Sequence, residues 1–264
     1  SGRMAGWSCP RRWRFKYVDR LPDPSGRAAL AGTFAHRVLE LLCQDDPRSR
    51  TFDAAKNLAR TAWDEFAATE DFLNLELEAE EARAFRWQAW LAIAGLWDIE
   101  DPATVEVVST EQKIQVELGS VPFVGVIDRV DRIGQDLVVS DYKSGTLPGY
   151  RWRHDKIQQV MLYAAALQSE TGKQPSRTRL LYLGQRILDI RVTQARIDNA
   201  LAMLTEAWVE IDQACGNDEF QPRPSVLCGW CPFVEQCPEG RAELVARAEA
   251  GRLPAHAPSA ALVA

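Results

Sequence analysis

Two runs of alternating apolar residues, 121–132 and 137–143, lie on either side of the short segment Gly134-Gln135-Asp136. A period of two predicts strands, and a glycine followed by polar residues predicts a tight turn between them. A chain with this pattern must therefore build part of its core from a β-sheet. We expect each strand to carry charged groups on an otherwise apolar side, and these two sides consist of Val126, Asp128 and Val130, and of Leu137, Val139, Asp141 and Lys143.

The two carboxylates and the ammonium group on these strands need partners, because an unpaired charge is costly to bury. A divalent cation held by Asp128 and Asp141, with Lys143 beside it, would satisfy all three groups. This combination is typical of metal-dependent phosphodiester hydrolysis. The alternative is a cluster of surface salt bridges on a hairpin, which is common in proteins.

The remaining pattern predicts an α/β fold with a mixed sheet flanked by helices. Helices are expected at 27–43, 53–68, 76–98, 155–170 and 194–214, and further strands at 104–117, 178–184 and 187–193. The turn Gly119-Ser120 joins the strand at 104–117 to the next one. We expect one domain over 1–254, with a helical insertion over about 51–100, and a disordered tail at 255–264.

Several function classes receive no support from the sequence. It has no apolar run long enough to cross a membrane, so we expect a cytoplasmic protein without a membrane partner. A phosphate-binding Gly-x4-Gly-Lys-Ser/Thr loop is absent, so the chain alone should not use ATP to unwind a duplex. The net charge of −6 gives no support to nucleic-acid binding, but such binding depends on local charge.

Two helices carry polar residues that could belong to an active site. His36 lies in the helix at 27–43, where a neutral imidazole could complete a metal site, although a helical histidine is more often simply solvated. Gln159 and Tyr163 are four residues apart, so they project from one side of the helix at 155–170. That helix is apolar nearly all round, so both side chains need hydrogen-bond partners; the alternative is an ordinary amphipathic helix.

Four cysteines are placed as ligands would be. Cys228, Cys231 and Cys237 follow a Cys-x2-Cys-x5-Cys spacing, and Cys9 stands near the other end of the chain. Four thiolates could bind zinc or an iron–sulfur cluster. Zinc sites usually come as two close pairs, so one distant fourth cysteine favours a cluster that joins the chain ends. Cys43 and Cys215 are expected to be unrelated to it.

Two basic stretches contain aromatic residues. Arginine and lysine beside aromatic rings suit backbone contacts and base stacking on single strands, although either stretch could be a solvated face. The candidate DNA-binding residues are Arg11, Arg12, Arg14, Lys16, Arg151, Trp152, Arg153 and Lys156.

Taken in order, these motifs resemble the RecB-type branch of the PD-(D/E)xK nucleases. The resemblance runs from Cys9-Pro10-Arg11-Arg12 to Cys237-Pro238 and is closest to the iron–sulfur members, such as AddB nuclease domains and CRISPR-associated RecB-like exonucleases. It implies a restriction-endonuclease-like core, Mg²⁺ or Mn²⁺, and a [4Fe–4S] cluster on the four cysteines. It also implies metal ligation by His36, Asp128, Asp141 and the backbone carbonyl of Tyr142, water activation by Lys143, and a Gln-x3-Tyr motif at Gln159 and Tyr163.

The resemblance predicts a metal-dependent DNA nuclease, an exonuclease on single-stranded DNA in repair or processing, working alone or with a helicase or repair partner. One alternative is a non-catalytic iron–sulfur subunit that binds DNA in a larger helicase–nuclease or CRISPR adaptation complex. Another is a ribonuclease.

Overall fold

The computed structural model describes residues 6–263. Contacts within these residues form two compact units. The larger unit is Pro24–Met203, and the smaller unit combines the two ends of the chain, up to Asp23 and from Leu204 onward. The single domain predicted over 1–254 includes residues of both units, and Cys9, Cys228, Cys231 and Cys237 all lie in the smaller one. Each unit is described below by itself.

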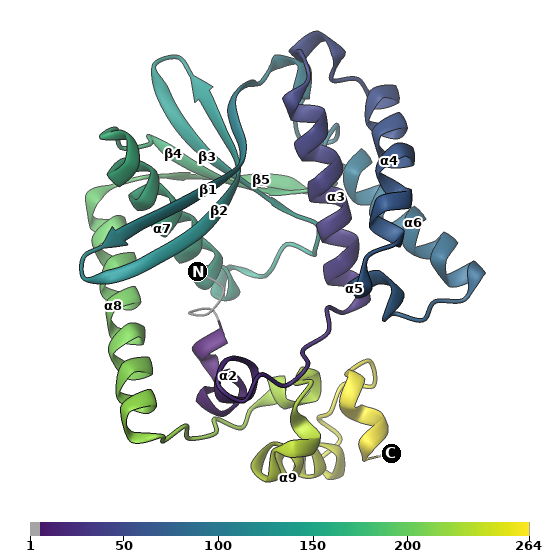
Figure 1. The fold of residues 1–264 in the computed structure, drawn as a ribbon, viewed down its shortest axis with the longest axis vertical. Helices are drawn as coiled ribbons and strands as arrows, with labels where there is room; N and C mark the ends of the chain where they lie inside the picture. The colour runs from purple at the N-terminus through teal and green to yellow at the C-terminus, as the bar shows by residue number, and fades with distance from the viewer. Residues whose placement is uncertain (1–5, 264) are drawn as a thin grey trace. The chain divides into compact units, whose positions relative to one another are not determined.

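The larger unit contains a five-stranded sheet in the order β1-β2-β3-β4-β5 (Figure 1). Its strands are β1 (Glu106–Leu118), β2 (Val121–Ile133), β3 (Asp136–Lys143), β4 (Arg177–Tyr182) and β5 (Arg186–Arg191). All neighbours are antiparallel except β3 and β4, which are parallel and are connected through α7 (His154–Thr171). A parallel pair requires such a crossover. The predicted mixed sheet flanked by helices is therefore confirmed.

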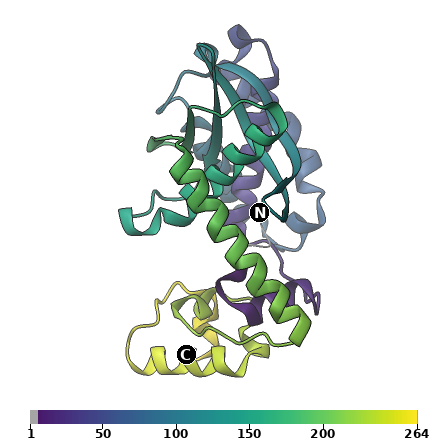
Figure 2. The same cartoon turned by 90° about the vertical axis from the view of Figure 1, so that its left-hand side faces the viewer.

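The β1–β2 hairpin is longer than the rest of the sheet (Figure 2). Its turn lies between Leu118 and Val121, with Gly119 in the left-handed conformation at a φ of 63°. Pairing of β2 with β3 begins only at Arg129, so the first part of β2 pairs with β1 alone. Asp128 is consequently placed where β2 and β3 separate, at an opening of the sheet.

Four helices precede the sheet: α3 (Arg27–Gln44), α4 (Phe52–Ala67), α5 (Glu70–Leu73) and α6 (Ala79–Ala94). They share a core in which Phe34 of α3 packs against Trp63 and Phe66 of α4. The single helix predicted at 76–98 is wrong in its bounds. Glu76 has a φ of 48°, and α6 begins only after a capping box at Glu78 and Glu81. This core fixes α3 in place (Figure 1).

The smaller unit contains α2 (Pro10–Tyr17), α9 (Pro238–Glu249) and several 3₁₀ turns. Trp13 stacks on Phe220 at 5.9 Å between ring centroids, so the two chain ends share a small aromatic core. Residues 255–263, expected to form a tail, include the turn η7, and Ser259 within it is buried. The 3₁₀ turns within residues 6–263 are η1 (Gly6–Ser8), η2 (Pro47–Ser49), η3 (Pro102–Thr104), η4 (Tyr150–Trp152), η5 (Val226–Trp230), η6 (Val234–Gln236) and η7 (Pro258–Leu262).

The remaining helix, α8 (Gln194–Asn217), begins in the larger unit and ends in the smaller one. Among residues 6–263, no helix has both the length and the apolar character needed to cross a bilayer.

Candidate metal centre

Three carboxylates form a row across the first three strands. The partners Thr110↔Arg129 and Gln112↔Ile127 place Glu111 opposite Asp128 in the β1–β2 pairing. The pair Arg129↔Ser140 is the first of the β2–β3 ladder, and its continuation places Asp128 opposite Asp141. Residues directly opposite each other in a sheet have their side chains on the same face. The sheet therefore gathers three acidic groups at the point where it opens.

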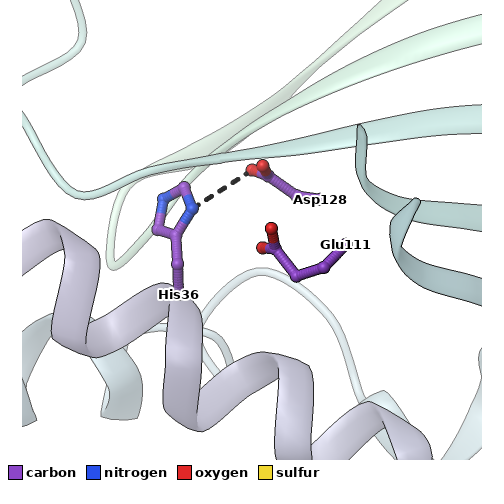
Figure 3. Close-up of side chains that lie close together, drawn as sticks. All are labelled: His36, Glu111 and Asp128. Carbon is purple, nitrogen blue, oxygen red and sulfur yellow. Dashed lines mark ion pairs between the residues drawn. The ribbon is translucent and has the colours of Figure 1, made fainter. Parts of the chain in front are cut away.

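The imidazole of His36 reaches this row from α3 (Figure 3). Its Nδ1 lies 3.4 Å from Oδ2 of Asp128, and the backbone N–H of Tyr142 donates to the same oxygen at 2.7 Å. Ligand atoms of His36, Glu111 and Asp128 all lie within 4.8 Å of one another. The arrangement matches the spacing of ligands around one cation, and it brings together two of the residues predicted to hold the metal.

A close approach of α3 to the end of β3 makes this possible. A Cβ atom at Gly32 would lie only 2.6 Å from Oγ of Ser144, the residue that follows β3. His36 is one helical turn after Gly32, on the same side of α3. In the segment Gly32-Thr-Phe-Ala-His36, Gly32 allows α3 to approach the end of β3 closely, and His36 can therefore reach the carboxylates.

Asp141 and Lys143 form an ion pair next to the group of His36, Glu111 and Asp128. Asp141 is only 3% exposed, and burial, followed by the charge of Asp128, raises the pKa of its carboxyl group despite Lys143. Burial lowers the pKa of Lys143, but the charge of Asp141 and a hydrogen bond to it outweigh that effect, so the pKa is raised. Lys143 is therefore charged at neutral pH in this arrangement.

The sequence reasoning missed Glu111. Its φ of 45° is unusual for a residue with a side chain, and its carboxyl group lies among the acidic groups of the row. Burial, with a further contribution from Asp128, raises the pKa of Glu111 to about 7. A usable signal existed in the sequence: counting back from the two-residue turn after Leu118 pairs position 111 with position 128.

The residues fit a divalent cation. The carboxylates of Glu111 and Asp128 converge with the imidazole of His36, and Asp141 lies within electrostatic range of Asp128 and is paired with Lys143, so negative charge is in excess. Burial lowers the pKa of His36, as it does that of Lys143. The hydrogen bond to Asp128 and the charges of Asp128 and Asp141 outweigh burial, so the pKa of His36 is raised above its usual value. Oxygen-rich sites of this kind suit Mg²⁺ and Mn²⁺.

The predicted Gln-x3-Tyr pair lies on α7, in the same unit. Nε2 of Gln159 donates to the phenol oxygen of Tyr163 at 3.1 Å. Tyr163 is 5% exposed and packs against Phe123, and a Cβ at Gly125 would lie 2.8 Å from its ring. The ring of Tyr163 therefore lies against the first part of β2, the strand that carries Asp128.

In the smaller unit, the four cysteines singled out by spacing line one pocket together with Arg12. Three of their sulfur atoms accept backbone N–H groups: Arg223 donates to Cys9 at 3.5 Å, Ser225 to Cys228 at 3.4 Å and Gly240 to Cys237 at 3.3 Å. Hydrogen bonds of this type are typical around metal-bound thiolates. The two cysteines expected to be unrelated lie elsewhere: Cys43 is buried in the larger unit, and Cys215 is exposed on α8.

The two basic stretches differ in how far their charges are already paired. In the smaller unit, Arg14 pairs with Asp19 and Asp218, and Lys16 pairs with Asp23. In the larger unit, Arg151, Trp152 and Lys156 are exposed. Arg11 donates to the carbonyl of Phe220, and Arg153 donates to that of Pro148.

Comparison with known proteins places this geometry in context. The model of the PD-(D/E)XK nuclease superfamily matches residues 7–238. The crystal structure of a candidate exonuclease from Eubacterium rectale is similar in fold, with a TM-score of 0.51 at 17% identity, over 84% of this chain and 80% of the other. No curated protein matches the sequence significantly.

Proposed function

Because the chain belongs to the PD-(D/E)XK nuclease superfamily, we propose that it is a metal-dependent deoxyribonuclease, and specifically an exonuclease on single-stranded DNA. One observation carries the proposal: a row of three carboxylates meets His36 and lies beside an aspartate–lysine ion pair. These are the groups that metal-assisted phosphodiester hydrolysis requires.

The proposed roles follow from where each side chain lies. His36, Asp128 and Glu111 would hold the cation, with Asp141 and the carbonyl of Tyr142 completing its ligands. The bound metal would polarise the scissile phosphate and lower the pKa of an attacking water. Lys143, oriented by Asp141, would donate a hydrogen bond to that water or to the phosphate and stabilise developing negative charge.

Gln159 and Tyr163 would act beside this centre. Their mutual hydrogen bond orients the phenol of Tyr163, whose ring lies against Gly125 of β2. A phenol and an amide can both donate to phosphate oxygens. We therefore assign them to holding the substrate strand, with Lys156 on the first turns of the same helix.

The preference for single strands rests on two features. The sequence has no loop for using ATP to separate strands, and it carries exposed aromatic and basic residues in η4. The structural neighbour is itself described as a candidate exonuclease. A role in repair or processing, with a helicase partner to supply single strands, is consistent with this preference.

For the smaller unit we propose a structural [4Fe–4S] cluster on Cys9, Cys228, Cys231 and Cys237, with zinc as the alternative. The shared pocket and the N–H donors to three sulfurs support it. Cys231→Ser should give colourless and less stable protein, whereas Cys215→Ser should give neither effect. Iron content, visible absorption and thermal unfolding of anaerobically purified protein would test this, and stoichiometric zinc without iron would refute the cluster.

The decisive experiment for activity is a digestion series. Single- and double-stranded DNA with 5′ or 3′ labels, and RNA, would be incubated with Mg²⁺, Mn²⁺ or EDTA. We expect metal-dependent release of short products from single-stranded DNA and none with Asp128→Ala. A non-catalytic subunit would bind these strands without cleaving them, and faster cleavage of RNA would identify a ribonuclease.

A further inference from the structure

Two aromatic rings in η4 are left in solvent. Tyr150 is 86% exposed and Trp152 is 79% exposed, the highest values among large hydrophobic side chains of residues 6–263. The next of them is Trp87 on α6, at 62%. Within the described chain neither η4 ring packs against another aromatic ring. Two neighbouring rings this exposed indicate a surface that is covered by something else.

The segment that carries these rings is held in place by hydrogen bonds at both of its ends. The side chain of Gln185, from the β4–β5 turn, accepts from the N–H of Leu147 at 2.8 Å and donates to the carbonyl of Gly145 at 3.0 Å. At the other end, Arg153 donates to the carbonyl of Pro148 at 2.9 Å. The rings are therefore presented on an ordered segment, which lowers the entropy cost of binding a partner.

This segment starts at the metal centre. It follows Lys143 directly, and the carbonyl of Lys143 accepts from the N–H of Leu183 at 3.0 Å. Tyr182 of β4 pairs with Lys143 in the β3–β4 ladder, and Gln185, from the turn that follows β4, holds the backbone of Gly145 and Leu147. The segment that leads to η4 is therefore anchored at the strand ends beside the aspartate–lysine ion pair, so a nucleic-acid strand bound at the metal centre would lie near it.

The charges around the rings define the partner. Arg151 and Lys156 are exposed, and Arg153 is partly exposed, so cations alternate with the rings along the segment. A neutral apolar protein surface would gain little from these cations, whereas a polyanion with flat apolar groups would use both. Unpaired nucleotides have this chemistry, because their phosphates are negative and their bases stack on aromatic rings.

We propose that Tyr150 and Trp152 stack on unpaired bases next to the scissile phosphate, with Arg151 and Arg153 contacting the flanking phosphates. The inference rests on the proposed nuclease function and adds to it the element that selects single strands. Bases in a duplex are already stacked on their neighbours, so the rings gain nothing from them. The surface would thus favour strands whose bases are free.

Binding is measured first, separately from cleavage. The probes are a single-stranded oligonucleotide, the same strand with one abasic nucleotide at each position in turn, and a blunt duplex, all bound to protein in Ca²⁺. We expect Trp152→Ala and Tyr150→Ala each to weaken single-strand binding about tenfold and to leave duplex binding unchanged. Trp152→Phe should retain most of the affinity, and Trp87→Ala is the matched control.

The abasic series identifies the contact. One abasic position should weaken binding to the wild type about tenfold and have little further effect on Trp152→Ala, because the stacking partner is already missing. In Mg²⁺, Trp152→Ala should raise KM and leave kcat nearly unchanged. Single-strand affinity equal to that of Trp87→Ala, or equal loss on duplex, would overturn the inference.

Failure of the two proposals can be told apart. Wild-type protein that binds single strands through Trp152 without cleaving them would refute the nuclease function and leave the stacking surface intact. Normal cleavage with no effect of either aromatic substitution would refute the stacking surface and leave the nuclease function intact. Tight binding of a protein or a lipid vesicle through Trp152, with no affinity for oligonucleotides, would refute both.

Discussion

Successive residues of β2 belong to two clusters of charged side chains, and the two clusters differ in their balance of charge. Asp128 belongs to the metal centre, and the side chain of Arg129 points to the other side of the strand. Arg129 is completely buried, with Glu100 at 2.7 Å, Asp131 at 2.8 Å and the phenol oxygen of Tyr142 at 2.8 Å. The cluster around Arg129, here called the closed cluster, contains its own cation. The cluster around Asp128, here called the open cluster, is the candidate metal centre.

The difference lies in the balance of charge. Around Arg129, the carboxylates of Glu100 and Asp131 meet two guanidinium groups, because Arg179 also pairs with Glu100. Ser140 adds a hydrogen bond to Asp131 at 2.6 Å. Around Asp128, three carboxylates meet one imidazole and one lysine, and the pKa values of Glu111 and Asp141 are raised. Charges that balance internally stabilise a fold, whereas an excess of one sign indicates a site for a ligand of the other sign.

The arginine cluster also connects the helical insertion to the sheet. Glu100 lies at the end of the insertion and pairs with both Arg129 of β2 and Arg179 of β4. The phenol bound by Arg129 belongs to Tyr142, whose backbone N–H donates to Asp128. The closed cluster therefore supports the open one through a single residue of β3.

The largest effect is expected on stability at Arg129. Arg129→Met leaves Asp131 buried without a cation and Glu100 with Arg179 alone, which should lower the free energy of unfolding by about 3–5 kcal/mol. Arg132→Met removes an exposed pair with Glu106 and should cost less than about 1 kcal/mol. Urea unfolding of both variants would compare them. Equal losses would mean that the arginine cluster is not a structural ion pair.

The next effect is expected on the reaction rate at Lys143. Lys143→Ala removes the ammonium group that Asp141 orients, and the single-turnover rate should fall by about a hundredfold or more. Mn²⁺ affinity should stay equal or increase, because a positive charge beside the cation is lost. Calorimetry and single-turnover kinetics on one preparation would separate the two quantities. A normal rate, or a Mn²⁺ affinity lost together with the rate, would contradict this role.

The smallest effect concerns Glu111 in metal-free protein. Its pKa is raised to about 7, so the folded state holds its proton at pH values where the unfolded state has released it. Stability in EDTA should therefore fall as the pH rises from 5 to 8, by roughly 1 kcal/mol after solvent screening. Glu111→Gln should remove this part of the pH dependence. An unchanged profile in that variant would show that Glu111 does not feel the other carboxylates.

The sequence predicted the open cluster better than the closed one. Asp128, Asp141 and Lys143 interrupt an alternating apolar pattern, and such interruptions are visible without a structure. The pairing of Arg129 with Glu100 is not visible, because it depends on how the insertion folds back onto the sheet. Glu111 could have been found from the hairpin register, but only by trusting the turn at Gly119-Ser120.

The sequence also predicted the bounds of some helices and strands better than those of others. The strand expected at 137–143 agrees with β3 to within one residue, because apolar alternation and a glycine turn define it. The helix expected at 76–98 contains α6 but extends beyond both of its ends, and local capping at Glu78 and Glu81 determines where α6 begins. The closeness of the four cysteines required the chain ends to meet, which spacing suggests but cannot establish.

The central claim is that the open cluster is built for a divalent cation, and thermal unfolding with MnCl₂ tests it most directly. Wild-type protein should gain about 2.7 kcal/mol of stability when Mn²⁺ reaches a hundred times its Kd. Asp136→Asn, at an exposed position of β3, should respond in the same way, whereas Asp128→Asn should respond hardly at all. A wild type that is not stabilised by Mn²⁺, or an Asp128→Asn variant stabilised equally, would contradict the account.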